Sequence, residues 1–178
     1  MKIIKTKFKD LFIIKQNKNS DNRGFLRETY NDQIIKKKFC FEYFTFSHKN
    51  VLRGFHFQIK HSQSKYVNVL KGKILDCVID LRCSSKTFGK SFKIILSEKN
   101  SLGLLIPRGF AHAYYSYEKE NIIYYKLDNY YNPIRERGII WNDKNLNIKW
   151  PNRKPSISKK DKILPTLKFC IKNRLTFK

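Results

Sequence analysis

Short apolar runs separated by turn residues fill most of the chain, and several alternate apolar with polar positions as half-buried β-strands do. This pattern predicts strands over residues 3–8, 11–16, 24–30, 41–47, 51–58, 92–97, 103–106, 112–116 and 122–127. Many short strands at this spacing favour a β-sandwich or a β-barrel. The sequence therefore predicts an all-β fold.

One further pair of runs, 67–70 and 74–81, lies on either side of Gly72. A glycine turn between two half-apolar runs predicts a β-hairpin. A few short helices accompany the strands. One is expected over residues 32–39 with Asn31 or Asp32 as its N-cap, and a second begins at Ser158, whose hydroxyl suits the same role.

The chain has no internal repeat, low-complexity tract or linker, which predicts one domain over residues 1–178, with the polar tail 151–178 packing back on its body. The length of 178 residues fits a single core, and 41% hydrophobic with 15% aromatic residues exclude a disordered chain. No apolar run approaches the roughly 20 residues of a membrane span, and early charges interrupt any signal-peptide core.

The cysteines show no CxxC spacing, so neither a zinc ribbon nor a redox motif is expected. Free thiols in a reducing cytoplasm are the simplest interpretation. These cysteines are Cys40, Cys77, Cys83 and Cys170.

The charge changes the list of partners to consider. Lys and Arg number 38 against 14 Asp and Glu, which gives a formal net charge of +24. Such an excess makes nucleic acid the first partner to test. Lysine is nevertheless spread over the whole chain, and its longest run is only Lys36-Lys37-Lys38. This spread favours a general drift of surface positions toward lysine, so specific binding of nucleic acid is not expected.

Four histidines are present, but no two have the HxH spacing of a metal-binding barrel, and no metal site is expected. His56 is the best candidate for an organic base. In a regular strand Leu52, Gly54, His56 and Gln58 share one face, and Gly54 would leave space beside an inward-pointing His56. The alternative is a core histidine that is hydrogen-bonded to a backbone carbonyl.

Other candidates are weaker when each is taken alone. Lys65 precedes a strongly apolar strand, so its ammonium could point into a pocket or into solvent. Tyr125 belongs to an aromatic cluster that could equally be a core face. Arg23 and Glu28 could form a surface ion pair of small energetic value.

In their order along the chain, these signals resemble the dTDP-4-dehydrorhamnose 3,5-epimerases, which are cofactor-free cupins. The resemblance extends from residue 3 to about residue 167. It rests on these segments: Asp21-Asn22-Arg23-Gly24 with Glu28, Val51-Leu52-Arg53-Gly54-Phe55-His56-Phe57-Gln58, Gln63-Ser64-Lys65, Lys86-Thr87-Phe88-Gly89, Leu96-Ser97-Glu98-Lys99-Asn100, Ile106-Pro107-Arg108-Gly109-Phe110-Ala111-His112, Tyr125-Lys126 with Tyr130-Tyr131, Trp141-Asn142-Asp143 with Trp150-Pro151, and Ser158-Lys159-Lys160-Asp161 with Pro165.

The resemblance implies a cupin-type jelly-roll barrel and a nucleotide-linked 4-keto-6-deoxy sugar as substrate, with no metal or other cofactor. By position, His56 matches the catalytic base and Asp161 the carboxylate that orients it. Tyr125 matches the proton donor on the opposite face of the sugar, and Lys65 matches the cation beside the keto oxygen.

The resemblance also implies a substrate-binding set and a homodimer in which an N-terminal strand crosses to the partner. Arg23 and Glu28 would then complete the neighbouring pocket. The set comprises the pyrophosphate clamp Arg23 and Arg53, Glu28 at the thymidine end, Tyr131 beside the nucleotide, the second pocket histidine His112, and Gln58.

The chain departs from the family pattern in the strand before His56. Tyr43-Phe44-Thr45-Phe46-Ser47 replaces a stretch of the form Gln-x-Asn-x-Ser, and Tyr114 stands where a phenylalanine is usual. These changes leave two alternatives open. One is a 3- or 5-epimerase acting on another 4-keto nucleotide sugar, such as a modified hexose or heptose. The other is a basic nucleic-acid-binding barrel without catalysis.

Overall fold

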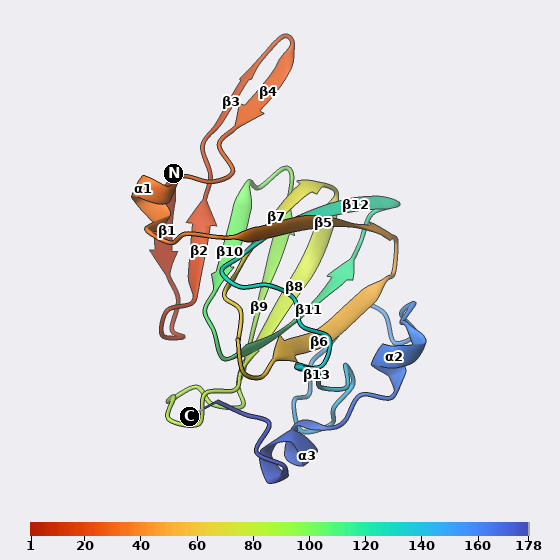
Figure 1. The fold of residues 1–178 in the computed structure, drawn as a ribbon. Helices are drawn as coiled ribbons and strands as arrows, with labels where there is room; N and C mark the ends of the chain where they lie inside the picture. Colours follow the sequence, from red (N-terminus) through yellow and green to blue (C-terminus); the bar gives the residue numbers. More distant parts are fainter. Residues whose placement is uncertain (178) are drawn as a thin grey trace.

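Two antiparallel sheets face each other in the computed structural model, which describes residues 1–177 (Figure 1). One sheet has the strand order β1 (Lys2–Lys5), β2 (Phe12–Lys15), β10 (Leu102–Ile106), β7 (Lys65–Lys71), β12 (Glu120–Leu127) and β5 (Phe41–His48). The other has the order β13 (Glu136–Gly138), β6 (Leu52–Gln58), β11 (Phe110–Ser116), β8 (Lys73–Asp80) and β9 (Ser91–Ser97). This arrangement is a cupin-type barrel, and the all-β prediction is confirmed.

Strand alternation builds the main core between the sheets. Val67 and Val69 of β7 point inward and belong to one buried cluster with Ile74 and Val78 of β8. The sequence pattern missed the two strands that have no apolar alternation. These are the polar β3 (Lys18–Asp21) and the three-residue β13.

The predicted hairpin around Gly72 is wrong. Strand β7 pairs with β10 and β12, whereas β8 pairs with β11 and β9, so the chain crosses from one sheet to the other at Gly72. Gly72 has φ +85°, and a Cβ there would lie 2.5 Å from the carbonyl oxygen of Glu120. A tight glycine corner with apolar flanks looks the same in sequence whether the strands pair or diverge.

The two predicted helix starts are confirmed. Helix α1 (Asp32–Ile35) is capped by Asn31, and it ends earlier than residue 39 because Lys36 adopts a left-handed conformation. Helix α2 (Lys159–Lys162) is capped by Ser158, whose hydroxyl accepts the N–H of Asp161. A further helix, α3 (Leu167–Lys172), was not predicted.

The C-terminal segment packs on the outer face of the five-stranded sheet. Leu167 and Cys170 of α3 are buried against Phe55 and Phe57 of β6. This contact holds the segment that contains α2 beside β6, with α2 on the same side of the barrel (Figure 1).

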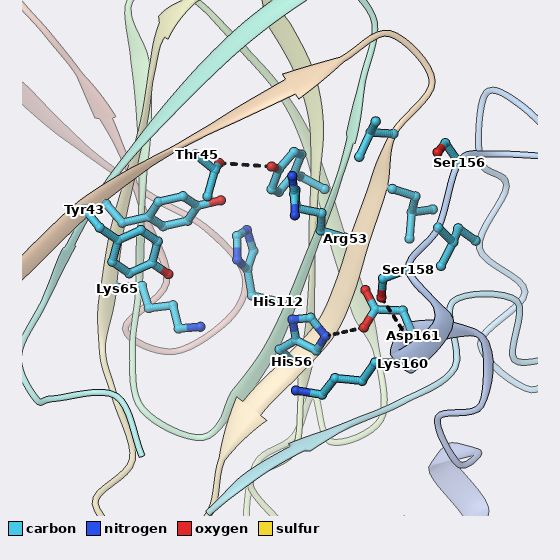
Figure 2. A pocket seen from close by; sticks show the side chains of 15 residues that line it. Tyr43, Thr45, Arg53, His56, Lys65, His112, Ser156, Ser158, Lys160 and Asp161 are labelled. Carbon is cyan, nitrogen blue, oxygen red and sulfur yellow. Dashed lines mark hydrogen bonds and ion pairs between the residues drawn. The ribbon is translucent and has the colours of Figure 1, made fainter. Parts of the chain in front are cut away.

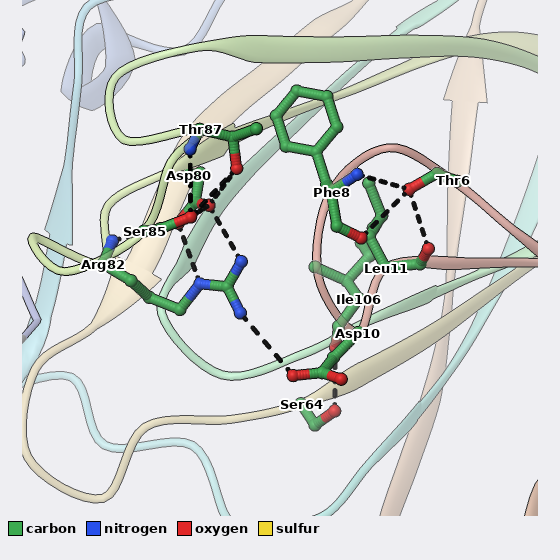
Figure 3. A network of polar contacts seen from close by, with 10 residues as sticks. All are labelled: Thr6, Phe8, Asp10, Leu11, Ser64, Asp80, Arg82, Ser85, Thr87 and Ile106. Carbon is green, nitrogen blue, oxygen red and sulfur yellow. Dashed lines mark hydrogen bonds and ion pairs between the residues drawn. The ribbon is translucent and has the colours of Figure 1, made fainter.

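A polar network fixes the loop that follows β8 (Figure 3). The buried carboxylate of Asp80 accepts hydrogen bonds from the side chains of Arg82, Ser85 and Thr87 at 2.6–2.9 Å. Burial would raise the pKa of Asp80, but these hydrogen bonds outweigh it and lower the pKa. Arg82 also approaches Asp10, in the turn between β1 and β2, at 3.9 Å.

Strands β3 and β4 (Gly24–Arg27) form a separate two-stranded arm that projects away from the barrel (Figure 1). Nearly all of its side chains are exposed, including Phe25 and Leu26 at 50% and 69%. Within residues 1–177, no helix is long and apolar enough to cross a membrane.

Candidate active site

A cavity of about 470 Å³ opens at one end of the barrel (Figure 2). Strands of both sheets and the segment around α2 contribute to its wall. The lining residues are Tyr43, Thr45, Val51, Leu52, Arg53, His56, Lys65, His112, Tyr114, Tyr125, Ser156, Ile157, Ser158, Lys160 and Asp161. A second cavity of about 350 Å³ shares Tyr43, His56, Lys65 and Lys160 with the first, so we describe the two as lobes of one site.

His56 is held by a carboxylate from the distant C-terminal segment. Its Nε2 lies 2.7 Å from Oδ1 of Asp161, and the backbone N–H of Gly54 donates to Oδ2 at 3.2 Å. The alternative of a carbonyl-bonded core histidine is therefore wrong. Because Nε2 faces Asp161, Nδ1 is the ring nitrogen left for chemistry, and it lies 4.0 Å from Oε1 of Glu136.

The carboxylate of Asp161 provides a negative charge beside His56. Burial acts to raise its pKa, but the hydrogen bond and charge of His56, with hydrogen bonds from Gly54 and Ser158, lower it overall. The carboxylate therefore stays ionised near neutral pH. An ionised Asp161 fixes the orientation of the imidazole and stabilises its protonated form.

An irregularity in β6 brings Arg53 and His56 to the same cavity. His56 pairs with His112 and Arg53 pairs with Tyr114, so three residue steps on β6 match two on β11. This bulge overturns the regular alternation predicted for the strand, which placed Arg53 on the opposite face.

The space expected beside Gly54 is also absent. A Cβ on Gly54 would lie 2.5 Å from the carbonyl oxygen of His112 and 2.8 Å from Cα of Ala113. Gly54 instead permits close contact between β6 and β11, and its backbone N–H donates to Asp161.

Lys65 and Tyr125 come from the sheet opposite His56. They lie on the neighbouring strands β7 and β12, and the side chains of both line the cavity. Figure 2 shows the ammonium of Lys65 directed into the cavity on the side facing His56. Burial lowers the pKa of Lys65, with partial compensation from the charges of Glu136 and Asp76. Burial likewise raises the pKa of Tyr125 well above its ordinary value, so its phenol remains protonated.

A second histidine–carboxylate pair lies beside the first. Nε2 of His112 is 2.8 Å from Oδ2 of Asp76, and both side chains are buried. The ring of His112 meets that of Tyr125 edge-on, with centroids 6.1 Å apart. Sequence reasoning predicted His112 but missed Asp76, because an aspartate inside an apolar strand gives no local sign of its partner.

Arg53 is oriented by a chain of hydroxyl groups. Its Nε donates to Oγ of Ser47 at 3.2 Å, and Ser47 is 2.8 Å from the hydroxyl of Tyr114. The Tyr114 hydroxyl also contacts Thr45 at 3.0 Å. Strand β5 thus supplies two of these hydroxyl groups, and its Phe46 carbonyl also accepts a hydrogen bond from Nη2 of Arg53 at 3.3 Å.

The second lobe contains two of the predicted binding residues. The amide of Gln58 is engaged by the adjoining loop, since it donates to the carbonyl of His61 at 2.6 Å and accepts from the N–H of Asn132 at 2.8 Å. Gln58 therefore holds the loop in place. The more exposed Tyr131 donates to Glu136 at 2.9 Å.

Glu136 and Lys160 were missed in the sequence. Lys160 forms an ion pair with Oε2 of Glu136, and both residues line the lobe that contains His56. Burial would raise the pKa of Glu136, but Lys160 and the charge of His56 lower it. Both residues lie in polar segments without periodicity, so only their position against β6 identifies them.

Arg23 and Glu28 lie outside the cavity of their own chain. Arg23 is on the projecting arm, where its exposed guanidinium forms a 2.6 Å ion pair with Asp21. Glu28 follows the arm and accepts hydrogen bonds from Asn17 and Asn31. Six of the predicted residues, His56, Tyr125, Lys65, Asp161, Arg53 and His112, do line one cavity.

The chain matches a family of known proteins over most of its length. The family model described as dTDP-4-dehydrorhamnose 3,5-epimerase matches residues 5–168. The enzyme of that name from Shigella flexneri is 39% identical over 168 residues, which cover 90% of this chain and 93% of that one.

Solved structures agree with this match. The Bacillus anthracis dTDP-4-dehydrorhamnose 3,5-epimerase with TDP and PPi bound has a TM-score of 0.90 at 38% identity, over 93% of this chain and 99% of that one. The Legionella pneumophila dTDP-6-deoxy-D-glucose-3,5-epimerase in complex with dTDP-4-keto-L-rhamnose has a TM-score of 0.93 at 34% identity, over 99% and 97%.

Proposed function

The chain belongs to the dTDP-4-dehydrorhamnose 3,5-epimerase family, and from this we propose that it is an isomerase that converts dTDP-4-dehydro-6-deoxy-D-glucose to dTDP-4-dehydro-L-rhamnose. The observation that carries the proposal is one cavity in which the His56–Asp161 pair faces Lys65 and Tyr125 from the opposite sheet. Epimerisation needs a base on one face of a sugar and an acid on the other, and this arrangement provides both.

The reaction follows from the acidity that the 4-keto group gives to its neighbouring carbons. Nδ1 of His56 removes the proton from carbon 3 or carbon 5, and the electron pair of that C–H bond moves to the keto oxygen. The ammonium of Lys65 stabilises the resulting enolate. Tyr125 then delivers its phenolic proton to the opposite face of the same carbon, and solvent restores both side chains. Every step is a proton transfer among these residues, the sugar and water.

The remaining cations and polar groups are assigned to substrate binding. Arg53 presents a planar guanidinium that suits two phosphate oxygens, and its orientation is supported by Ser47. His112 lies between this end and the sugar position. Gln58 and Tyr131 line the second lobe, beside His56 and Lys65.

Incubation of the protein with dTDP-4-dehydro-6-deoxy-D-glucose in deuterated water tests the proposal. We expect deuterium at carbons 3 and 5 and inversion at both, measured by NMR. Tyr125→Phe should still exchange but lose complete inversion, because the base remains while the opposite proton donor is gone. Exchange at one carbon alone would favour the alternative of a single-carbon epimerase, which the altered strand 43–47 motivates.

A homodimer in which the arm reaches the neighbouring barrel is part of the proposal. It is supported by the projection of the arm from its own barrel and by the exposed Phe25 and Leu26 on it. In such a dimer Arg23 and Glu28 would complete the partner's site, with Arg23 exchanging Asp21 for the pyrophosphate.

Mixing two inactive variants tests this dimer. In a hybrid of an Arg23→Ala chain with a His56→Ala chain, one site has its own His56 and receives Arg23 from the partner. We expect the mixture to regain activity at that site after subunit exchange. No recovery, or a monomer by analytical ultracentrifugation, would show that Arg23 does not act across subunits. The same mixture of Arg23→Ala with wild type controls for dilution.

We also assign the enzyme to the cytoplasm. The support is chemical, since Cys40, Cys77, Cys83 and Cys170 are all free thiols. Thiols remain reduced in that compartment. The nucleic-acid alternative is motivated by the charge and the altered strand 43–47, and salt-dependent binding to DNA or RNA without sugar exchange would favour it.

A further inference from the structure

Tyr43 is the closest aromatic neighbour of the proposed proton donor. It lies on β5 directly opposite Tyr125 of β12, and the two rings are stacked with centroids 4.9 Å apart and planes 23° apart. Tyr43 is 36% exposed, whereas Tyr125 is 3% exposed. Tyr43 therefore covers one face of the Tyr125 ring at the junction of the two lobes, both of which it lines.

Ring contacts hold Tyr125 on two sides. His112 meets it edge-on at 6.1 Å, and Tyr43 stacks on its face. The ring of Tyr43 also contacts that of Phe41, with centroids 5.6 Å apart. An aromatic side chain turns about two bonds only, so two fixed rings around it define its position.

We propose that Tyr43 is a positioning residue whose ring holds the phenol of Tyr125 in the orientation that delivers a proton to the sugar. This inference rests on the proposed function and adds a residue to it. Proton transfer to carbon is sensitive to alignment, and a small displacement of the donor slows it strongly. Removal of the proton by His56, from the opposite sheet, does not depend on this stack.

Tyr43 acts on Tyr125 through its ring and not through a charge. Desolvation raises the pKa of Tyr43 to about 12, with smaller contributions from the nearby Tyr114, Glu136 and Tyr131. The phenol is thus neutral at physiological pH. Its effect on Tyr125 comes through contact, and a phenylalanine would preserve that contact.

Three variants separate a role of the Tyr43 ring from a role of its hydroxyl. Tyr43→Phe keeps the stack, Tyr43→Leu removes it, and Phe44→Leu is a matched control on the other face of the same strand, where Phe44 is 66% exposed. Each is assayed with dTDP-4-dehydro-6-deoxy-D-glucose in deuterated water, and exchange and inversion are measured separately by NMR.

We expect Tyr43→Leu to slow inversion about tenfold, as loss of one aromatic contact from an aligned donor implies, with exchange retained. Tyr43→Phe and Phe44→Leu should keep both rates near those of the wild type. If Tyr43→Leu does not fold, as judged by circular dichroism, Tyr43→Thr provides the same comparison in a strand-favouring residue.

Other results would overturn the inference. An unchanged ratio of inversion to exchange in Tyr43→Leu would show that the stack does not position Tyr125. An equal loss of inversion in Tyr43→Phe would assign the effect to the Tyr43 hydroxyl and not to its ring. Absence of exchange in the wild type would instead refute the proposed function, so the two failures are distinguishable.

Discussion

Replacement of His56 by alanine is expected to abolish exchange of the sugar hydrogens with deuterated water, with a loss of about 10²–10⁴-fold or more. The reason is that Asp161 holds Nε2 of His56, which leaves Nδ1 as the ring nitrogen available to the sugar. Without the imidazole, the proton at carbon 3 or 5 has no positioned acceptor. The measurement is the rate of deuterium incorporation by NMR, together with the amount of inverted product.

His48→Ala is the matched control. His48 is an exposed histidine on β5 outside the cavity lining, so its removal should leave both rates unchanged. If His56→Ala retained exchange while a variant of another cavity residue lost it, the assignment of the base would be wrong. His112 is the obvious substitute, since it also has a carboxylate partner.

Local features of the site could be predicted from the sequence, whereas contacts between distant residues could not. Ser158 was recognisable as a helix cap because capping is a local property of a few residues. That Asp161, in the same turn, reaches His56 is a contact across 105 residues. No local pattern contains that information, so the pairing came only from the resemblance to a family.

The predictions from the sequence were wrong where the backbone departs from the regular alternation of strand residues between two faces. The bulge between Arg53 and His56 and the corner at Gly72 each change which face or sheet a residue belongs to. Apolar and polar positions alone do not distinguish these from a regular strand and a hairpin. The polar residues Glu136 and Lys160 were missed for a related reason, because their function depends on neighbours in space.

The residues that line the cavity account for only a small part of the net charge of +24. Lys65, Arg53 and Lys160 are the lysine and arginine side chains that line the main cavity. Lys160 is neutralised by Glu136, which leaves Lys65 and Arg53 to face an anionic substrate. The cavity thus uses very few of the 38 basic residues, and the general excess raises the local concentration of anions without specifying one.

Lys65 is the cation whose removal should have opposite effects on activity and stability. Its ammonium forms no ion pair within residues 1–177, although it lies in the wall of the cavity. A partly buried charge without an ion-pair partner loses hydration in the folded state, which destabilises it. Lys65→Met, which conserves length and removes the charge, should therefore leave the protein as stable as the wild type or more so.

The same substitution should lower the epimerisation rate about 10²–10³-fold, since it removes the charge that stabilises the enolate oxygen. The measurement is the rate of inversion beside a thermal melt. Lys144→Met, at an exposed position away from the cavity, is the control and should alter neither. Full activity in Lys65→Met would refute the role of the ammonium.

The pH dependence of the wild type provides an independent check, because burial lowers the pKa of Lys65 below its ordinary value of 10.5. As pH rises through the lowered pKa, the folded protein loses this proton first and activity should fall. Between the lowered pKa and 10.5 the unfolded chain still binds the proton, so this residue's contribution to the free energy of unfolding should increase with pH. Lys65→Met should lose both dependences, whereas Lys144→Met should retain them, and a decline of activity at the same pH in Lys65→Met would assign it to another group.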